Sequence, residues 1–266
     1  MWLDEDKPIL KRDLVLEKPF LNTSGALGFT PHPAAGPIFD FLGAFITNPI
    51  SRNPRQPAAN RIYLPFPGGF MLHTGHPNPG ITRAVKRYQR RWAGAALPVI
   101  IHVLVESPSM LAEMVRKLEG LENILALELG LPPDCDPGLL SVIMAAGVGE
   151  LPVIPCLNPG QIPIFLDTLK ELKPITVHLV EPRGSMPAPD GGLVTGRLYG
   201  PAIFPVMLQA AQTLVNAGLQ VIANGGVIAR WQVDAFLKAG VIGIGLACAF
   251  WQVEQAQLLR VLNNSN

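Results

Sequence analysis

The sequence has few charged residues, and this shortage limits what the protein can be. Asp, Glu, Lys and Arg make up only 15% of the 266 residues, and the formal net charge is +1. A typical globular domain carries ~25% charged residues, so much of this chain must be buried in a core or against a partner subunit. A net charge near zero gives no long-range field that would attract nucleic acid or an anionic membrane.

Cysteines and long apolar runs are also scarce. Cys135, Cys156 and Cys248 form an odd and sparse set, which does not build a disulfide framework and indicates the reducing cytoplasm. The segment 1–7 is acidic and lacks the basic start and apolar stretch of a signal peptide. The longest strongly apolar run, 241–251, is too short to span a bilayer, which needs ~20 residues. We therefore expect a cytoplasmic protein without a membrane segment.

Short apolar segments that recur along the chain predict a parallel sheet. Each is too short for a helix and too apolar to have a solvent-facing side, which is typical of strands covered on both faces. Segments with helical spacing lie between most of them. The predicted strands span 20–24, 43–47, 98–103, 124–129, 152–157, 175–180, 220–223 and 242–247, and the predicted helices span 81–92, 110–118, 161–172, 201–217, 231–239 and 252–262.

Eight buried strands alternating with helices favour a (β/α)8 barrel, which typically has ~250 residues. We predict an α/β chain in which residues 1–266 form one barrel domain. Ile9–Leu10 and Leu14–Leu16 flank a charged stretch, which suits a short N-terminal hairpin that closes the bottom of the barrel. An open, doubly wound sheet is the competing architecture.

Glycines and small residues stand where several predicted strands end, on the side of a barrel that carries reactive groups. Small residues at 22–28, after the first strand, allow close approach of a flat ligand. The seventh strand leads into 224–227 and the eighth into 247–249, each before a helix. Turns of this kind hold a phosphate through main-chain N–H groups. Ordinary turns and tight packing of helices on strands are the alternative explanations, and 200–205 is either a further phosphate contact or a plain helix start.

These segments resemble the class 1 dihydroorotate dehydrogenases along nearly the whole chain. The matching stretches are 22–28, 42–47, 67–80, 200–205 and 224–227. The resemblance implies an FMN at the barrel mouth and oxidation of a CH–CH bond of dihydroorotate or a related small ring, as in pyrimidine biosynthesis. A proton would leave C5 and a hydride would pass from C6 to the flavin.

The resemblance also implies which residues contact the cofactor. The residues implied to bind FMN are Thr23, Ser24, Gly25, Thr47, Asn48, Gly200, Asn224, Gly225, Gly226, Ala247 and Cys248.

The resemblance further implies partners. Barrels of this family pair, and we therefore expect a homo-oligomer, a dimer, with a small-molecule substrate.

The sequence departs from the family where positive charge meets the flavin. Asn48 follows Thr47 where the family has a lysine, and Cys156 stands at the position of a second family lysine. Cations in this region stabilise reduced flavin, and we expect Arg183 and Arg197 to lie on the surface rather than to replace them.

The asparagines that bind orotate in the family are missing as well. Leu72, the stretch 130–137 and the pair Val180-Glu181 occupy their positions. Each polar partner that a buried ring loses costs ~1–3 kcal/mol, so orotate recognition in the family's manner is not expected.

Three residues are candidates for proton transfer. Cys135 lies two residues past the position of the family's base, but it stands between two aspartates, which disfavour a thiolate. His73 and His76 have a spacing that can bring two imidazoles together. A loop cysteine without a role and exposed loop histidines are the alternatives.

Two further histidines, His102 and His178, lie inside predicted strands, and we expect both to be satisfied structural residues. No third ligand accompanies His73 and His76, so we predict no metal site. Three functions stay open: the FMN oxidoreductase, a flavin enzyme for another substrate, and a barrel retained as a non-catalytic structural or assembly subunit.

Overall fold

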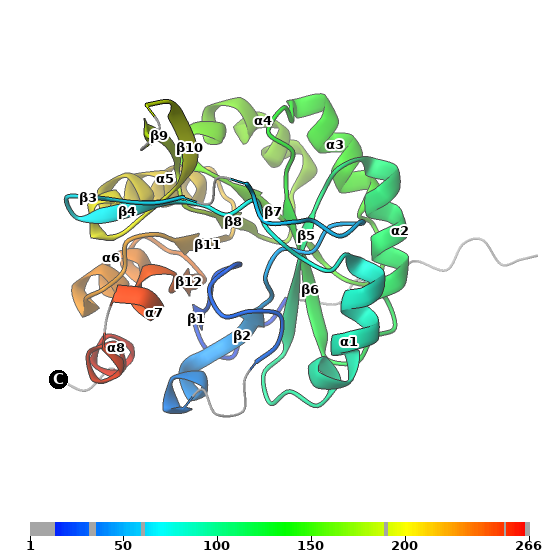
Figure 1. Cartoon of the computed structure of the whole chain (residues 1–266), viewed down its shortest axis with the longest axis horizontal. Helices are drawn as coiled ribbons and strands as arrows, with labels where there is room; N and C mark the ends of the chain where they lie inside the picture. Colours follow the sequence, from blue (N-terminus) through cyan, green and yellow to red (C-terminus); the bar gives the residue numbers. More distant parts are fainter. Residues whose placement is uncertain (1–13, 32–35, 60–61, 189–190, 253, 264–266) are drawn as a thin grey trace, which may run out of the picture.

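The computed structural model describes the chain apart from residues 1–13, 32–35, 60–61, 189–190, 253 and 264–266. Eight parallel strands close into a barrel in the order β1-β12-β11-β8-β7-β6-β5-β2 (Figure 1), so the predicted (β/α)8 fold is confirmed and the open sheet is excluded. The barrel strands are β1 (Phe20–Leu21), β2 (Leu42–Ile46), β5 (Val99–Leu104), β6 (Ile124–Gly130), β7 (Val153–Leu157), β8 (Val177–Leu179), β11 (Val221–Asn224) and β12 (Gly243–Gly245).

Helices surround the barrel, and the predicted ones are present with small differences in their ends. The helices are α1 (Ile81–Ala93), α2 (Pro108–Leu118), α3 (Pro137–Ala146), α4 (Ile162–Leu172), α5 (Phe204–Asn216), α6 (Arg230–Lys238), α7 (Cys248–Gln252) and α8 (Gln255–Leu262), with 3-10 turns η1 (Gly36–Phe41), η2 (Pro159–Gln161) and η3 (Pro201–Ile203). None of the described helices has the length and apolar character needed to cross a lipid bilayer.

Helix α3 was not predicted from the sequence. The side chain of Asp136 caps it by accepting a hydrogen bond from the main-chain N–H of Leu139 at 2.7 Å, and Pro137 occupies the first turn. The helix is apolar on almost every side, so it shows little of the periodic pattern that identifies an amphipathic helix.

The bottom of the barrel interior is filled by an apolar layer against which Leu14 and Leu16 pack. We call this layer the inner apolar cluster; it consists of Leu21, Ala44, Ile46, Ile100, Ala126, Ile154 and Ile222. The first arm of the predicted N-terminal hairpin, Ile9–Leu10, lies outside the described residues. The second arm, Leu14–Leu16, is not a strand, but it contacts the base of the barrel.

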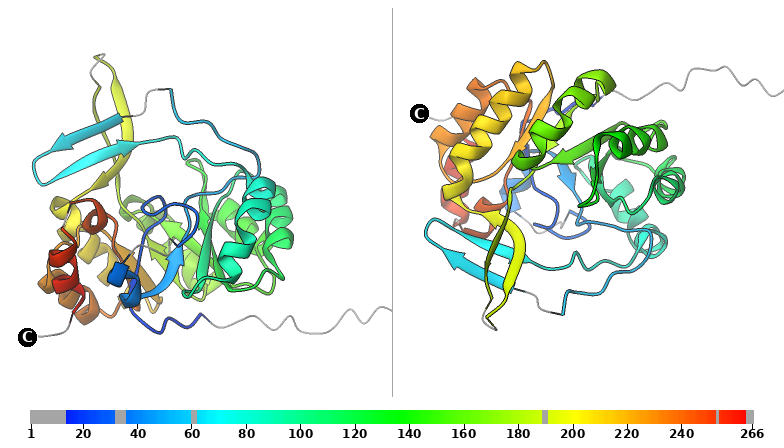
Figure 2. Two further views of the ribbon diagram at one scale, coloured as in Figure 1. Left: turned by 60° about the horizontal axis from the view of Figure 1, so that its bottom comes forward. Right: turned by 90° about the horizontal axis from the view of Figure 1, so that it is seen from above.

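A second sheet, which the sequence analysis did not predict, covers the carboxyl-terminal mouth. Its strands β3 (Ile62–Phe66), β4 (Gly69–His73), β9 (Arg183–Pro187) and β10 (Leu193–Tyr199) pair in the order β3-β4-β10-β9, and all are antiparallel. The hairpin β3–β4 follows β2 and the hairpin β9–β10 follows β8, so both project from the same end of the barrel (Figure 2). Gly69 is required where they meet, because a Cβ there would lie 2.1 Å from the carbonyl oxygen of Tyr199.

Candidate functional site at the barrel mouth

A polar layer lies directly above the inner apolar cluster. Residues two positions apart on a strand point to the same side, and four barrel strands place a polar residue two positions after a member of that cluster. These residues are His102, Glu128, Cys156 and Asn224; His178 of β8 joins them, and all five are buried.

Glu128 is the centre of this polar layer. Its Oε2 atom lies 2.5 Å from Nδ1 of His102, and its Oε1 atom contacts Nδ1 of His178. Burial by itself would raise the pKa of Glu128, but the facing imidazoles of His178 and His102 outweigh burial and hold that pKa below its usual value. The carboxylate is therefore ionised and bound to a histidine on each side.

The two histidines differ in how they are bonded. Nε2 of His178 lies 2.6 Å from Oδ1 of Asn224, so both of its ring nitrogens have partners. Burial would lower the pKa of His178, but the Glu128 carboxylate outweighs it and raises that pKa. His178 is thus the satisfied residue that the sequence predicts. His102 is not, because its Nε2 atom is buried without a hydrogen-bond partner.

Unpartnered polar atoms surround the mouth. Among the described residues, four buried side-chain atoms lack a hydrogen-bond partner: Oγ1 of Thr23, Oγ of Ser24, Nε2 of His102 and Oε1 of Glu181. Buried polar atoms in native proteins nearly always have partners. Their concentration at the ends of barrel strands indicates a place for a polar ligand.

A cavity of about 460 Å³ lies between this mouth and the antiparallel sheet. Its wall includes Arg55, His73, His76, Cys156, Glu181 and Arg197. Volumes of ~300–1,000 Å³ are typical of small-molecule sites.

Arg197 enters this site from β10. Its side chain is 24% exposed, and its Nη1 atom lies 3.7 Å from Oε2 of Glu181. The expected surface position of Arg197 is therefore wrong, whereas Arg183, on the outer strand β9, is exposed as expected. Burial raises the pKa of Glu181, and the Arg197 guanidinium opposes that effect.

The three proton-transfer candidates lie in different surroundings. His73 and His76 both line the cavity. Burial, followed by the positive charge of Arg197, lowers the pKa of His76 to about 3. Cys135 is half-buried outside that lining, and its thiol faces the carbonyl of Asp136 at 3.6 Å. Burial and the charges of Asp136 and Asp134 raise its pKa to about 11.

Several residues that the resemblance assigns to the cofactor already bond within the protein. Oγ1 of Thr47 accepts a hydrogen bond from the N–H of His102 at 3.1 Å, and Oδ1 of Asn48 accepts one from the N–H of Gly28 at 3.1 Å. None of the predicted cofactor residues lines the cavity. Thr23 and Ser24 differ from Thr47 and Asn48, because their hydroxyl groups have no hydrogen-bond partner within the protein.

Main-chain N–H groups converge at the corner predicted for a phosphate. Burial and the charge of Glu181 raise the pKa of the Cys248 thiol to about 11, and the nearby N–H groups of Gly200, Gly226 and Cys248 oppose that rise. The thiol donates its own hydrogen bond to the carbonyl oxygen of Val227 at 3.6 Å. Phe70 and Tyr199 pack against the neighbouring Ala247. We call these three N–H groups the amide cradle.

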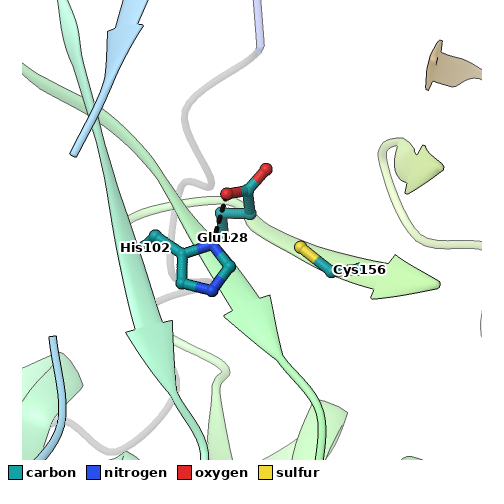
Figure 3. A group of neighbouring side chains, drawn as sticks. All are labelled: His102, Glu128 and Cys156. Atoms are coloured by element: carbon teal, nitrogen blue, oxygen red, sulfur yellow. Dashed lines mark hydrogen bonds and ion pairs between the residues drawn. The ribbon is translucent and has the colours of Figure 1, made fainter. Parts of the chain in front are cut away.

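His102, Glu128 and Cys156 also form a set of metal-donor types that the sequence analysis did not anticipate (Figure 3). One donor atom from each lies within 4.8 Å of the others. Both oxygens of Glu128, however, are already engaged by imidazoles. The arrangement is that of a hydrogen-bonded network.

A closed barrel with buried ionisable side chains and a ligand-sized cavity at its carboxyl-terminal mouth is the architecture that barrel enzymes use. The chain is 27% identical over 261 residues to the catalytic subunit of dihydroorotate dehydrogenase B (NAD(+)) of Desulforudis audaxviator, with 89% of this chain and 84% of that protein covered.

Two further relatives carry the same name. The Trichlorobacter lovleyi protein is 24% identical over 259 residues, with 89% of this chain and 84% of that protein covered, and the Pyrococcus furiosus protein is 25% identical over 264 residues, with 90% and 85% covered. No family model matches the chain. The chain is thus similar to catalytic subunits of dihydroorotate dehydrogenase B along most of its length, which confirms the resemblance.

Proposed function

We propose that this chain is an FMN-dependent oxidoreductase of dihydroorotate dehydrogenase type that oxidises a CH–CH bond of dihydroorotate or a related small ring. The observation that carries the proposal is the set of buried, unpartnered polar atoms around the mouth of a barrel related to those enzymes. A polar ligand that bonds to these atoms would remove the desolvation cost of leaving them unpaired.

The residues present fit an FMN at two places. Gly200, Gly226 and Cys248 would supply three N–H groups for a phosphate, next to the Cys248 sulfur. Thr23 and Ser24 offer unpartnered hydroxyls to the polar edge of the ring. When bound, FMN would supply the hydride acceptor for the oxidation.

Arg197 would provide the positive charge that the two missing lysines supply in the family. Its Nη1 atom lies 3.7 Å from Oε2 of Glu181, and its charge acts on Cys156, which stands at the position of one of those lysines. Its guanidinium cannot lose its proton at neutral pH, so it would favour an anionic ligand at the mouth.

The cavity would receive the substrate. Gly130, Leu72 and Glu181, which replace family asparagines, all contribute to its wall. Three arginines, Arg55, Arg183 and Arg197, face two carboxylates, those of Glu106 and Glu181. This excess of positive charge favours a ring that carries a negative group, bound differently from orotate in the family.

The test is an absorption spectrum of the purified protein, as isolated and after addition of FMN. We expect protein-bound flavin bands, and we expect dihydroorotate or another anionic dihydro-ring to bleach them in the absence of oxygen. A protein that remains colourless after FMN is added would instead support the non-catalytic barrel. Pairing of two chains stays a prediction, which sedimentation of the same sample measures.

A further inference from the structure

The reaction proposed above needs a group that accepts a proton, and two of the three candidates from the sequence, Cys135 and His76, are poorly suited to it. Cys135 does not line the cavity and has a raised pKa. His76 lines the cavity, but its lowered pKa makes it a weak base. His178 has partners on both ring nitrogens. His102 is the histidine of the polar layer that keeps a ring nitrogen free.

The carboxylate of Glu128 fixes the orientation of the His102 ring. The two residues face each other in register on β5 and β6, and Oε2 of Glu128 accepts the hydrogen bond from Nδ1 of His102. In Figure 3, Nε2 lies on the side of the ring away from Glu128, toward the ends of these strands. A carboxylate that binds Nδ1–H leaves Nε2 as the basic atom and stabilises the imidazolium that forms after protonation.

Gly130 separates Nε2 from the cavity. A Cβ at Gly130 would lie 2.7 Å from Nε2 of His102 and 3.2 Å from Cδ2 of Leu104, and both Gly130 and Leu104 line the cavity. Because Gly130 has no side chain, the imidazole can occupy the space behind the cavity wall. His102 itself does not line the cavity, so a ligand would have to approach Nε2 over the Cα of Gly130.

We propose that His102 is the proton acceptor of this barrel, with Nε2 as the basic atom and Glu128 as the residue that positions the ring. A C–H bond of the bound ring breaks, its proton forms an N–H bond at Nε2, and the electron pair forms the new C=C bond as hydride leaves the adjacent carbon. The hydride would pass to the flavin of the proposed function. The identity of this reaction therefore rests on that proposed function.

Chemical modification of the histidines tests the free nitrogen without a substrate or a flavin. Diethyl pyrocarbonate acylates unprotonated, unbonded imidazole nitrogens, and peptide mass spectrometry of the full chain measures each site. We expect His102 to react faster than His178, although both are equally buried, at 1% exposure. Equal rates at the two residues would overturn the proposal.

Gly130→Ala is the variant to compare with the wild type. Its added methyl group would cover Nε2 of His102, whereas the contact between Nδ1 and Glu128 on the other side of the ring would remain. We expect the modification of His102 to slow in this variant, with its thermal unfolding transition retained. If the variant does not fold, His102→Ala replaces it. Imidazole added to His102→Ala should then restore flavin reduction that the substitution has lowered by ~10²–10⁴-fold.

Each result separates this inference from the proposed function. Fast modification of His102 in a protein that does not bind added FMN would support the free nitrogen and reject the redox assignment. Flavin reduction at an unchanged rate in His102→Ala would reject His102 and keep the assignment. Stoichiometric zinc that His102→Ala removes would place a metal on the ring and also overturn the proposal.

Discussion

The two sides of the barrel mouth are built from different parts of the chain. On the side of β1, β11 and β12, the amide cradle consists of main-chain N–H groups. On the side of β5 to β8, the mouth consists of ionisable side chains, among them His102, Glu128 and Glu181. Main-chain groups stay in place when side chains change, whereas a side-chain site changes with each substitution. This difference would allow a barrel to keep the proposed phosphate corner while its proposed substrate side changes.

Glu128→Ala should have the largest effect on the side-chain half of the mouth. The substitution leaves two buried imidazoles without their acceptor, and removing one partner of a buried pair costs ~3–5 kcal/mol. Urea unfolding measures the loss. Glu122→Ala, which removes an exposed carboxylate, should change the unfolding free energy by less than ~0.5 kcal/mol. A similar small change in Glu128→Ala would show that the polar layer contributes little.

Arg197→Ala should have the next largest effect, because it leaves the buried carboxyl of Glu181 without its cation. We expect a loss of ~1–3 kcal/mol in unfolding free energy, together with weaker binding of FMN. Arg83→Ala, which removes an exposed guanidinium on α1 outside the cavity lining, is the control. Equal effects of the two substitutions would place Arg197 outside the site.

Cys248→Ala tests the main-chain side of the mouth, and here we expect FMN to bind more tightly rather than more weakly. It removes the sulfur that lies next to the amide cradle, so the three N–H groups become available to a phosphate. A hydrogen bond contributes ~0.5–1.5 kcal/mol net, which corresponds to FMN binding tighter by roughly twofold to twelvefold. Fluorescence titration measures the affinity, and weaker binding in the variant would contradict the assignment of the cradle.

The smallest expected effect is a change in how stability depends on pH. The pKa of His76 is lowered from 6.5 to about 3, so the unfolded chain binds a proton below pH 6.5 that the folded chain does not. His76 therefore makes the unfolding free energy decrease as the pH falls below 6.5.

His76→Asn should reduce this slope, and asparagine tolerates the left-handed backbone of position 76, where φ is 53°. Thermal melts of the wild type and of His76→Asn at several pH values measure the slope, and the same slope in both proteins would contradict the lowered pKa.

The barrel could be predicted from the sequence because its strands are buried on both faces and appear as short apolar runs. The antiparallel sheet could be predicted only in part. Its hairpin β3–β4 contains the turn signal Pro67-Gly68 between alternating residues, but the pairing of β4 with β10 joins segments more than a hundred residues apart. That pairing depends on tertiary structure.

The polar layer left a signal in the sequence that was used only in part, because His102 and His178 were considered and Glu128 was not. His102, Glu128 and His178 each interrupt an otherwise apolar strand, and an ionisable residue in such a strand must have a partner inside the barrel. The free nitrogen of His102 could not be inferred, because it depends on ring orientation and on the absence of a side chain at Gly130.

Titration of the purified chain with FMN, with and without competing inorganic phosphate, tests the central claim most directly. We predict that flavin fluorescence saturates at one FMN per chain and that phosphate shifts the curve to higher FMN concentration, because both ligands use the N–H groups of Gly200, Gly226 and Cys248. A fluorescence signal that stays that of free FMN at every protein concentration would contradict the account.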